Sequence, residues 1–210
     1  MFITVEGIEG VGKTTHLKTI NDYLCEKGHV VVLTREPGGT PMGEEIRHII
    51  LSHRGEKVLP MTELLLLFAA RMQHIETVIR PALLRGEWVL CDRFIDATYA
   101  YQGGGRGMPW DVIHQLEQLV VKDCKPDLTL IFDVPVATGL NRVKKRQQVE
   151  DRIEQEKIEF FERVRKAYLE RASLNKNQYR VIDAQKTLVE VQEIVLDQIK
   201  RWLEGACAIN

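Results

Sequence analysis

The stretch that decides the fold of this 210-residue chain is Phe2-Ile3-Thr4-Val5-Glu6-Gly7-Ile8-Glu9-Gly10-Val11-Gly12-Lys13-Thr14. Its last eight residues match the phosphate-loop pattern G-x-x-x-x-G-K-[ST]. In such a loop the glycines let backbone N–H groups curl around phosphate oxygens, the lysine reaches the outer phosphates, and the hydroxyl contacts Mg²⁺. The apolar run before the motif predicts a strand, and residues 14–27 have the apolar spacing of a helix. Because the motif requires this context, we predict a nucleotide site here.

The predicted nucleotide site consists of the loop and the start of the helix that follows. It comprises Gly7, Ile8, Glu9, Gly10, Val11, Gly12, Lys13, Thr14 and Thr15. We expect ATP as the ligand, and Mg²⁺ carried in with ATP as the metal. The four cysteines and six histidines are scattered without the spacing of a zinc site or a disulfide framework.

The charge pattern argues against a nucleic-acid or membrane partner. The formal net charge is −1, and the basic residues do not form a stripe with interleaved aromatic residues. No apolar run reaches the length of a membrane span, and Glu6 interrupts the first run too early for a signal peptide. We therefore expect a soluble, cytoplasmic protein.

Short apolar runs alternate with amphipathic segments along the chain. The runs at 2–5, 30–33, 88–90, 128–132 and 179–182 predict buried strands. The alternation favours an α/β fold: a P-loop NTPase three-layer sandwich, with a five-stranded parallel sheet and helices on both faces. The length fits a single domain over residues 1–210. Thr62 is placed to cap a long helix that ends near Pro81, and residues 156–173 and 188–203 predict outer helices.

Charged residues follow the predicted strands, whose carboxyl ends meet at one edge of a parallel sheet. Asp92 ends the third strand and is a candidate for holding Mg²⁺ together with Thr14, while Asp133 after the fourth strand is a weaker candidate. A helix-capping role is the alternative for both aspartates. Cations near this edge could bridge two anionic substrates. They are Arg35, Arg71, Arg93 and Arg106.

A basic segment lies between the fourth and fifth predicted strands. It contains Arg142, Lys144, Lys145 and Arg146, and Arg152 follows shortly after. A solvated basic helix end is one interpretation of this segment. Its polar sequence favours a lid at about residues 142–156 that closes over ATP and adds positive charge to the reaction.

Four motifs in this order resemble those of the thymidylate kinases, a family of phosphate-loop nucleoside monophosphate kinases. They are the phosphate loop, Arg35-Glu36-Pro37-Gly38-Gly39, Phe68-Ala69-Ala70-Arg71, and Asp92-Arg93 leading to Ala100-Tyr101-Gln102-Gly103. The resemblance covers nearly the whole chain. It implies transfer of the γ-phosphoryl group of Mg·ATP to dTMP, giving dTDP and ADP. It also implies a homodimer, for which the apolar helix of residues 62–80 is a candidate face.

The resemblance further implies roles for individual residues. Phe68 would stack on thymine, and Arg71 would donate to a carbonyl of the base. Arg35 and Arg93 would hold the phosphate of dTMP. Glu9 would bind the 3′-hydroxyl, which would explain a carboxylate beside bound phosphates.

Other substrate-binding positions follow from the same motifs. Tyr101 would pack where a 2′-hydroxyl would sit, Gln102 would lie near the base, and Pro37 would follow either a cis peptide bond or a simple turn. Ala97 stands where many family members carry Ser, so Thr98 is a candidate for supplying a hydroxyl instead.

Members of the family differ in whether the catalytic cation comes from the phosphate loop or from the lid. Gly10 leaves only Lys13 in the loop, which matches the lid type and implies Lys13, Arg93, Arg146 and Arg152 as catalytic residues. The sequence leaves open which basic residue of the lid points inward. A kinase for another nucleoside monophosphate remains the alternative. A nucleotide-hydrolysing switch is weaker, because the Asn-Lys-x-Asp motif that reads guanine is missing.

Overall fold

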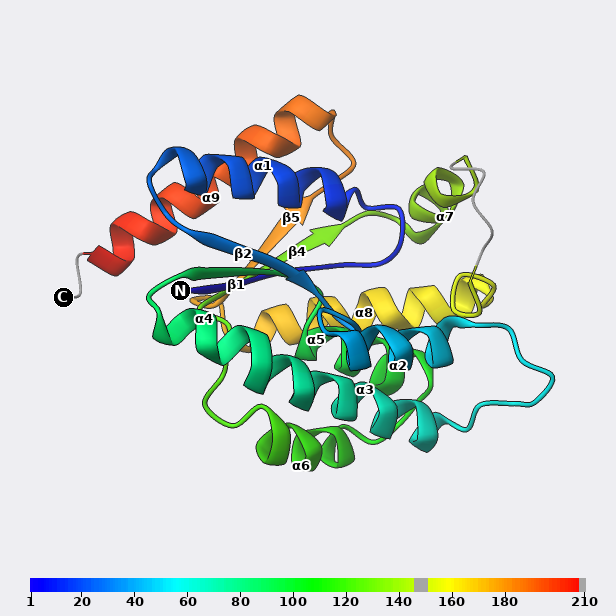
Figure 1. Ribbon diagram of the computed structural model, residues 1–210. Coiled ribbons are helices and arrows are strands. Elements are labelled where there is room, and N and C mark those ends of the chain that lie inside the picture. Colours follow the sequence, from blue (N-terminus) through cyan, green and yellow to red (C-terminus); the bar gives the residue numbers. More distant parts are fainter. Residues whose placement is uncertain (146–150, 208–210) are drawn as a thin grey trace.

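The computed structural model describes residues 1–145 and 151–207. At its centre lies a five-stranded sheet in the order β2-β3-β1-β4-β5, with every neighbouring pair parallel (Figure 1). The strands are β1 (Phe2–Glu6), β2 (Val31–Arg35), β3 (Trp88–Asp92), β4 (Leu128–Asp133) and β5 (Tyr179–Asp183). The α/β class and all five strands predicted from the alternating pattern are confirmed.

Helices cover both faces of the sheet. On one face lie α1 (Lys13–Glu26) and α9 (Leu188–Cys207), and α8 (Ile158–Leu174) crosses the other face (Figure 1). Beside α8 lie α2 (Pro41–Leu51), α3 (Pro60–His74), the π-helical η1 (Ile75–Ile79), α4 (Arg80–Leu84), α5 (Ile95–Thr98), the π-helical η2 (Tyr99–Gly105) and α6 (Trp110–Val120). Within residues 1–145 and 151–207, no helix combines the length and apolarity needed to cross a bilayer.

The central strand β1 is buried along its whole length, because helices cover both of its faces. Its one hydroxyl, on Thr4, lies 2.9 Å from the hydroxyl of Thr129 in β4, so both polar side chains are satisfied inside the core. The register pairs Val5 with Asp92, and Asp92 with Arg35 on the other side. The residues that follow β1, β2 and β3 therefore leave the sheet at one level, and the site is built there.

The helix expected to start at Thr62 begins earlier. Leu59 precedes α3, no side chain caps it, and Pro60 occupies the first helical turn, where a missing N–H costs nothing. The prediction of Thr62 as the cap was therefore wrong. Before Pro81 the helix widens into η1, as expected where proline removes a hydrogen bond and its ring crowds the preceding turn.

The helix after β4, α7 (Val136–Lys144), packs directly on the phosphate loop. Gly10 has a φ of +75°, and a Cβ there would lie 2.1 Å from the carbonyl oxygen of Gly139 in α7. Both residues must be small for the two backbones to approach this closely. The N-terminal part of the predicted lid is thereby fixed to the loop, whereas Arg146 lies outside the described residues.

Candidate active site

A cavity opens where the chain leaves β1, β2 and β3. One end is lined by the phosphate loop, through Glu9, Gly10, Gly12, Lys13 and Thr14. The other end is lined by Glu36, Pro37, Arg47, Leu67, Arg71, Phe94, Ala97, Thr98, Tyr101 and Gln102. Asp92 and Arg93, where the chain leaves β3, line the same cavity. The cavity can thus take a phosphate-bearing ligand at each end.

The phosphate loop has its lysine folded back on its own backbone. The ammonium group of Lys13 donates to the carbonyl oxygens of Gly7 (3.1 Å) and Ile8 (3.0 Å). Burial, together with the nearby Arg93 guanidinium, lowers the pKa of Lys13 to about 8. The side chains of Ile8 and Val11 are buried in the core, so the loop offers a ligand its backbone amides at these positions. Thr14 and Thr15 are exposed at the start of α1.

Two oxygen atoms near the loop suit a hard cation. Asp92 ends β3, and its Oδ1 atom is buried without a hydrogen-bond partner among the described residues, so Asp92 does not act as a helix cap. The exposed hydroxyl of Thr14 lines the same cavity. One carboxylate and one hydroxyl, completed by phosphate oxygens and water, are a donor set that Mg²⁺ accepts. Asp133, the weaker candidate, is engaged by Arg165 in a two-pronged ion pair at 2.7 and 2.8 Å.

Arg93 links the phosphate loop to the rest of the cavity. Its guanidinium donates to the carbonyl oxygen of Gly7 at 2.7 Å, to Glu9 Oε1 at 2.9 Å and to the hydroxyl of Tyr168 at 3.0 Å. The hydroxyl of Tyr101 lies 2.7 and 2.8 Å from the two carboxylate oxygens of Glu9. The sequence placed Glu9, Arg93 and Tyr101 in one site, and the structure brings them into contact.

At the far end of the cavity, two polar atoms lack partners among the described residues. Arg71 is buried; its Nε donates to Glu36 at 2.7 Å and its Nη2 to the Phe94 carbonyl at 3.1 Å, which leaves Nη1 unpaired. The Thr98 hydroxyl is also buried and unpaired. Buried polar groups normally have partners, so these two atoms are available to form hydrogen bonds with a polar ligand at this end of the cavity. The amide of Gln102 is engaged by Glu63 at 2.8 Å.

Phe68 is not among the residues that line this cavity, so its stacking on thymine stays a prediction. Its ring is buried in the core and lies under the Arg71 guanidinium, 5.1 Å from ring centroid to guanidinium carbon. Leu67 lines the cavity instead. Residues four apart share a helix face, so Leu67 points the same way as Arg71, and helical spacing was the signal that could have identified it.

Arg35 is likewise not among the residues that line the cavity, and its contact with the phosphate of dTMP stays a prediction. Its side chain is half-exposed and pairs with Glu44 at 2.8 Å, outside the cavity lining. Arg47, from the second half of α2, lines the cavity and donates to the Pro37 carbonyl at 3.0 Å. The peptide bond between Glu36 and Pro37 is cis. Arg47 was not predicted from the sequence, because it lies inside a helix, away from any strand end or glycine motif. The chain bends at Gly38-Gly39 before α2, and such a bend does not reveal which helix face meets the site.

The basic residues of the predicted lid take three different positions. Arg142 donates to the carbonyl oxygens of Ala184 (3.1 Å) and Gly10 (3.5 Å), beside the phosphate loop. Lys144 and Lys145 are exposed. Arg152 donates to the Ile50 carbonyl at 2.9 Å and forms an ion pair with Glu63, so in this structure it points away from the phosphate loop. Glu63 is shared with Arg106, which also pairs with Glu156.

Comparison with known proteins agrees with this geometry. The thymidylate kinase family model matches residues 5–195. The chain belongs to the thymidylate kinase family. A thymidylate kinase of Ectopseudomonas mendocina is 57% identical over 207 residues, which cover 99% of this chain and 98% of that protein. A thymidylate kinase of Alcanivorax borkumensis is 50% identical over 204 residues, covering 96% and 98%.

A solved structure shows the same fold. The crystal structure of thymidylate kinase from Ehrlichia chaffeensis superposes with a TM-score of 0.76 at 35% sequence identity, and covers 95% of this chain and 98% of that one. The chain is therefore an enzyme, a kinase of nucleotide biosynthesis, and dTMP is the acceptor that its family phosphorylates.

The lowered pKa of Lys13 predicts a pH-dependent affinity for ATP. The ammonium group loses its proton as pH rises from 7 to 9, and bound phosphates, which favour the charged form, must restore it. We expect ATP affinity to fall about tenfold over this range, with uptake of a proton on binding. Calorimetry in two buffers of different ionisation enthalpy measures the ATP affinity and the number of protons taken up. Lys13→Met keeps the other titrating groups of the site and should remove the uptake; uptake that persists in Lys13→Met would contradict the assignment.

Proposed function

We propose that the chain transfers the γ-phosphoryl group of ATP to dTMP within this cavity, with ATP on the phosphate loop and dTMP at the end lined by Arg71 and Thr98. The observation that carries this proposal is the position of Arg93, which contacts the phosphate loop and borders the acceptor end. A cation between two anionic substrates offsets their repulsion as donor and acceptor approach. Because both substrates are nucleotides, we place the reaction in the cytoplasm.

The acceptor end supplies contacts for each part of dTMP. The unpaired Arg71 Nη1 suits a carbonyl of thymine, and the unpaired Thr98 hydroxyl suits another polar atom of the base. Arg47 and Arg93, which both line the cavity, would hold the phosphate of dTMP. Arg47 would thus do what the sequence led us to expect of Arg35. Glu9 keeps its place as the partner of the 3′-hydroxyl, with its carboxylate oriented by Arg93 and Tyr101.

Catalysis would rest on positioning and charge, without a covalent enzyme intermediate. When bound, Mg²⁺ would neutralise charge on the phosphates, and Asp92 and Thr14 are the residues that would hold it. Lys13 would leave the Gly7 and Ile8 carbonyls to reach the outer phosphates of ATP. Arg152 would have to release Glu63 before it could reach ATP, and Arg146 remains a prediction from the sequence.

An acceptor panel tests the proposed reaction. We expect ADP release from Mg·ATP to require an acceptor, and to be fastest with dTMP among dTMP, dUMP, UMP, CMP, AMP and GMP. Equal rates without any acceptor would indicate a hydrolase or switch. A preference for another nucleotide would show a different monophosphate kinase on the same scaffold.

Paired truncations of Leu67 and Phe68 test which side chain forms the wall of the base site. Leu67→Ala should raise the KM for dTMP severalfold and leave the KM for ATP unchanged, because it removes an apolar surface of the acceptor end. Phe68→Ala should instead destabilise the fold by about 3–5 kcal/mol, because it empties a core position. Steady-state kinetics and thermal unfolding separate the two effects. The reverse pattern would restore Phe68 as the stacking residue.

We also propose a homodimer that pairs through α2 and α3. Large apolar side chains are exposed on these neighbouring helices: Met42, Ile49, Met61, Leu65 and Met72. Met61, Leu65 and Met72 share one face of α3 by helical spacing. Several large apolar side chains exposed on neighbouring helices are typical of an interface.

A charged substitution on this face tests the homodimer. Leu65→Glu should convert the protein to a monomer in light-scattering measurements. Leu188→Glu is a matched control, because the two leucines are 51% and 52% exposed and Leu188 starts α9 on the opposite face of the sheet (Figure 1). A wild-type protein that is monomeric at micromolar concentration would contradict the proposal.

A further inference from the structure

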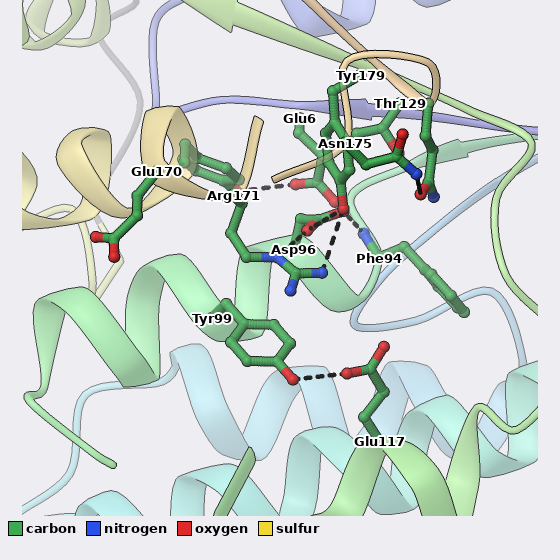
Figure 2. A network of polar contacts seen from close by, with 12 residues as sticks. Glu6, Phe94, Asp96, Tyr99, Glu117, Thr129, Glu170, Arg171, Asn175 and Tyr179 are labelled. Carbon is green, nitrogen blue, oxygen red and sulfur yellow. Dashed lines mark hydrogen bonds and ion pairs between the residues drawn. The ribbon is translucent and has the colours of Figure 1, made fainter. Parts of the chain in front are cut away.

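Arg93 contacts, through Tyr168, a cluster of buried polar side chains that are not among the residues lining the cavity. Figure 2 shows part of this cluster, around Glu6, Asp96, Arg171 and Tyr179. Two carboxyl groups belong to it: Glu6 at the end of β1, which is 0% exposed, and Asp96 in α5, which is 1% exposed. Arg171, Tyr179 and Tyr168 complete the cluster. Burying this many polar groups costs stability unless each is well paired, so a particular arrangement is being maintained here.

The two carboxyl groups serve different parts of the structure. Asp96 Oδ1 accepts from Arg171 Nε at 2.7 Å and from the Tyr179 hydroxyl at 2.9 Å, and so ties α5 to α8 and β5 (Figure 2). Glu6 Oε1 accepts from the backbone N–H of Phe94 at 2.7 Å, and Glu6 Oε2 accepts from the Tyr168 hydroxyl at 2.9 Å. Each of these two hydrogen bonds of Glu6 connects it to Arg93, one through the backbone and one through the side chain.

The first connection is through the backbone. Arg93 has a φ of +67°, a left-handed conformation that an arginine adopts at a cost of roughly 1–2 kcal/mol. Its own N–H donates to the Val5 carbonyl at 3.0 Å, and the next N–H, that of Phe94, donates to Glu6. The turn is thus pinned on both sides by residues at the end of β1.

The second connection is through the side chain. Arg93 Nη1 donates to the Tyr168 hydroxyl at 3.0 Å, and that hydroxyl donates to Glu6. A hydroxyl can accept one bond and donate another at the same time, so the chain from Arg93 to Tyr168 to Glu6 has a consistent direction. Glu6 is therefore connected to Arg93 twice: to its backbone turn through the N–H of the next residue, Phe94, and to its guanidinium through the Tyr168 hydroxyl.

We propose that Glu6 is a positioning residue for the acceptor: together with Tyr168 it sets the turn and the guanidinium of Arg93 in the orientation that receives the phosphate of dTMP. This inference rests on the proposed role of Arg93. Glu6 and Tyr168 touch neither substrate. Their effect reaches dTMP only through Arg93, and ATP, which binds along the backbone of the phosphate loop, should be affected far less.

The cluster contains its own matched control. Tyr168→Phe removes the hydroxyl that holds the Arg93 guanidinium. Tyr179→Phe removes a hydroxyl of another buried tyrosine in the same cluster, one that is bonded to Asp96 and Arg171 and not to Arg93. Both variants should lower the melting temperature by a similar amount. Only Tyr168→Phe should raise the KM for dTMP, by about tenfold, the factor expected for loss of one hydrogen bond to a charged group. The KM for ATP should stay within about twofold of wild type in both.

Variants at Arg93 separate this inference from the function on which it rests. If Arg93→Ala leaves the KM for dTMP unchanged, the proposed role of Arg93 fails. If Arg93→Ala raises it and Tyr168→Phe does not, the positioning role fails while the function stands. On an Arg93→Ala background, adding Tyr168→Phe should have no further effect on the KM for dTMP. Should Tyr168→Phe not fold, Glu6→Asp, which keeps the carboxyl group but shortens the side chain by one methylene, must raise the KM for dTMP and spare that for ATP; an equal change in both would overturn the proposal.

Discussion

The ion pair between Arg93 and Glu9 joins the phosphate loop to the end of β3, and the cavity is arranged around it. The pair forms because β1 and β3 are parallel neighbours with Val5 beside Asp92, so the residues after the two strands emerge at the same level. A guanidinium this close to the loop backbone also helps to lower the pKa of Lys13. One pairing between strands thus determines where the two cations stand, and where phosphates can bind.

The charged side chains around the cavity differ in how strongly their partners fix them. Arg71 is locked by Glu36, and Glu36 is held in turn by His74 at 2.9 Å, all three being buried. A buried network of this kind fixes one geometry, and removal of a member leaves a buried charge without its partner. Arg152 and Arg106 instead share the single buried carboxylate of Glu63, each pairing with a different oxygen. The side chains of the acceptor end are therefore fixed before a ligand binds, whereas Arg152, which is expected over ATP, has another partner in this structure.

Features of the site could be predicted from the sequence where they depend on the order of neighbouring elements and on the direction of the strands. A strand, a glycine loop and a helix in succession predicted the nucleotide end of the cavity. The charges at the strand ends predicted that Asp92 and Arg93 lie near the phosphate loop. The sequence was insufficient where the direction of a side chain matters. Phe68 and Leu67 are adjacent and both apolar, and only the rotation of α3 against the core decides which one faces the cavity. Arg35 and Arg152 carry the expected charge, but each pairs with a carboxylate that the motifs did not single out, Glu44 and Glu63 respectively. The pairing of β1 with β3 and the packing of α8, which together gather Glu6, Arg93 and Tyr168, likewise leave no pattern in the sequence.

Binding of dTMP and thymidine to the wild type and to Arg93→Ala tests the central claim most directly, because the two ligands differ only in the phosphate that Arg93 is held to receive. We expect the wild type to bind dTMP at least tenfold more tightly than thymidine, and Arg93→Ala to lose most of that preference while its affinity for thymidine changes little. An equal preference for dTMP in both proteins would show that the phosphate is held elsewhere, and would contradict the account of Arg93 as the residue on which the site depends.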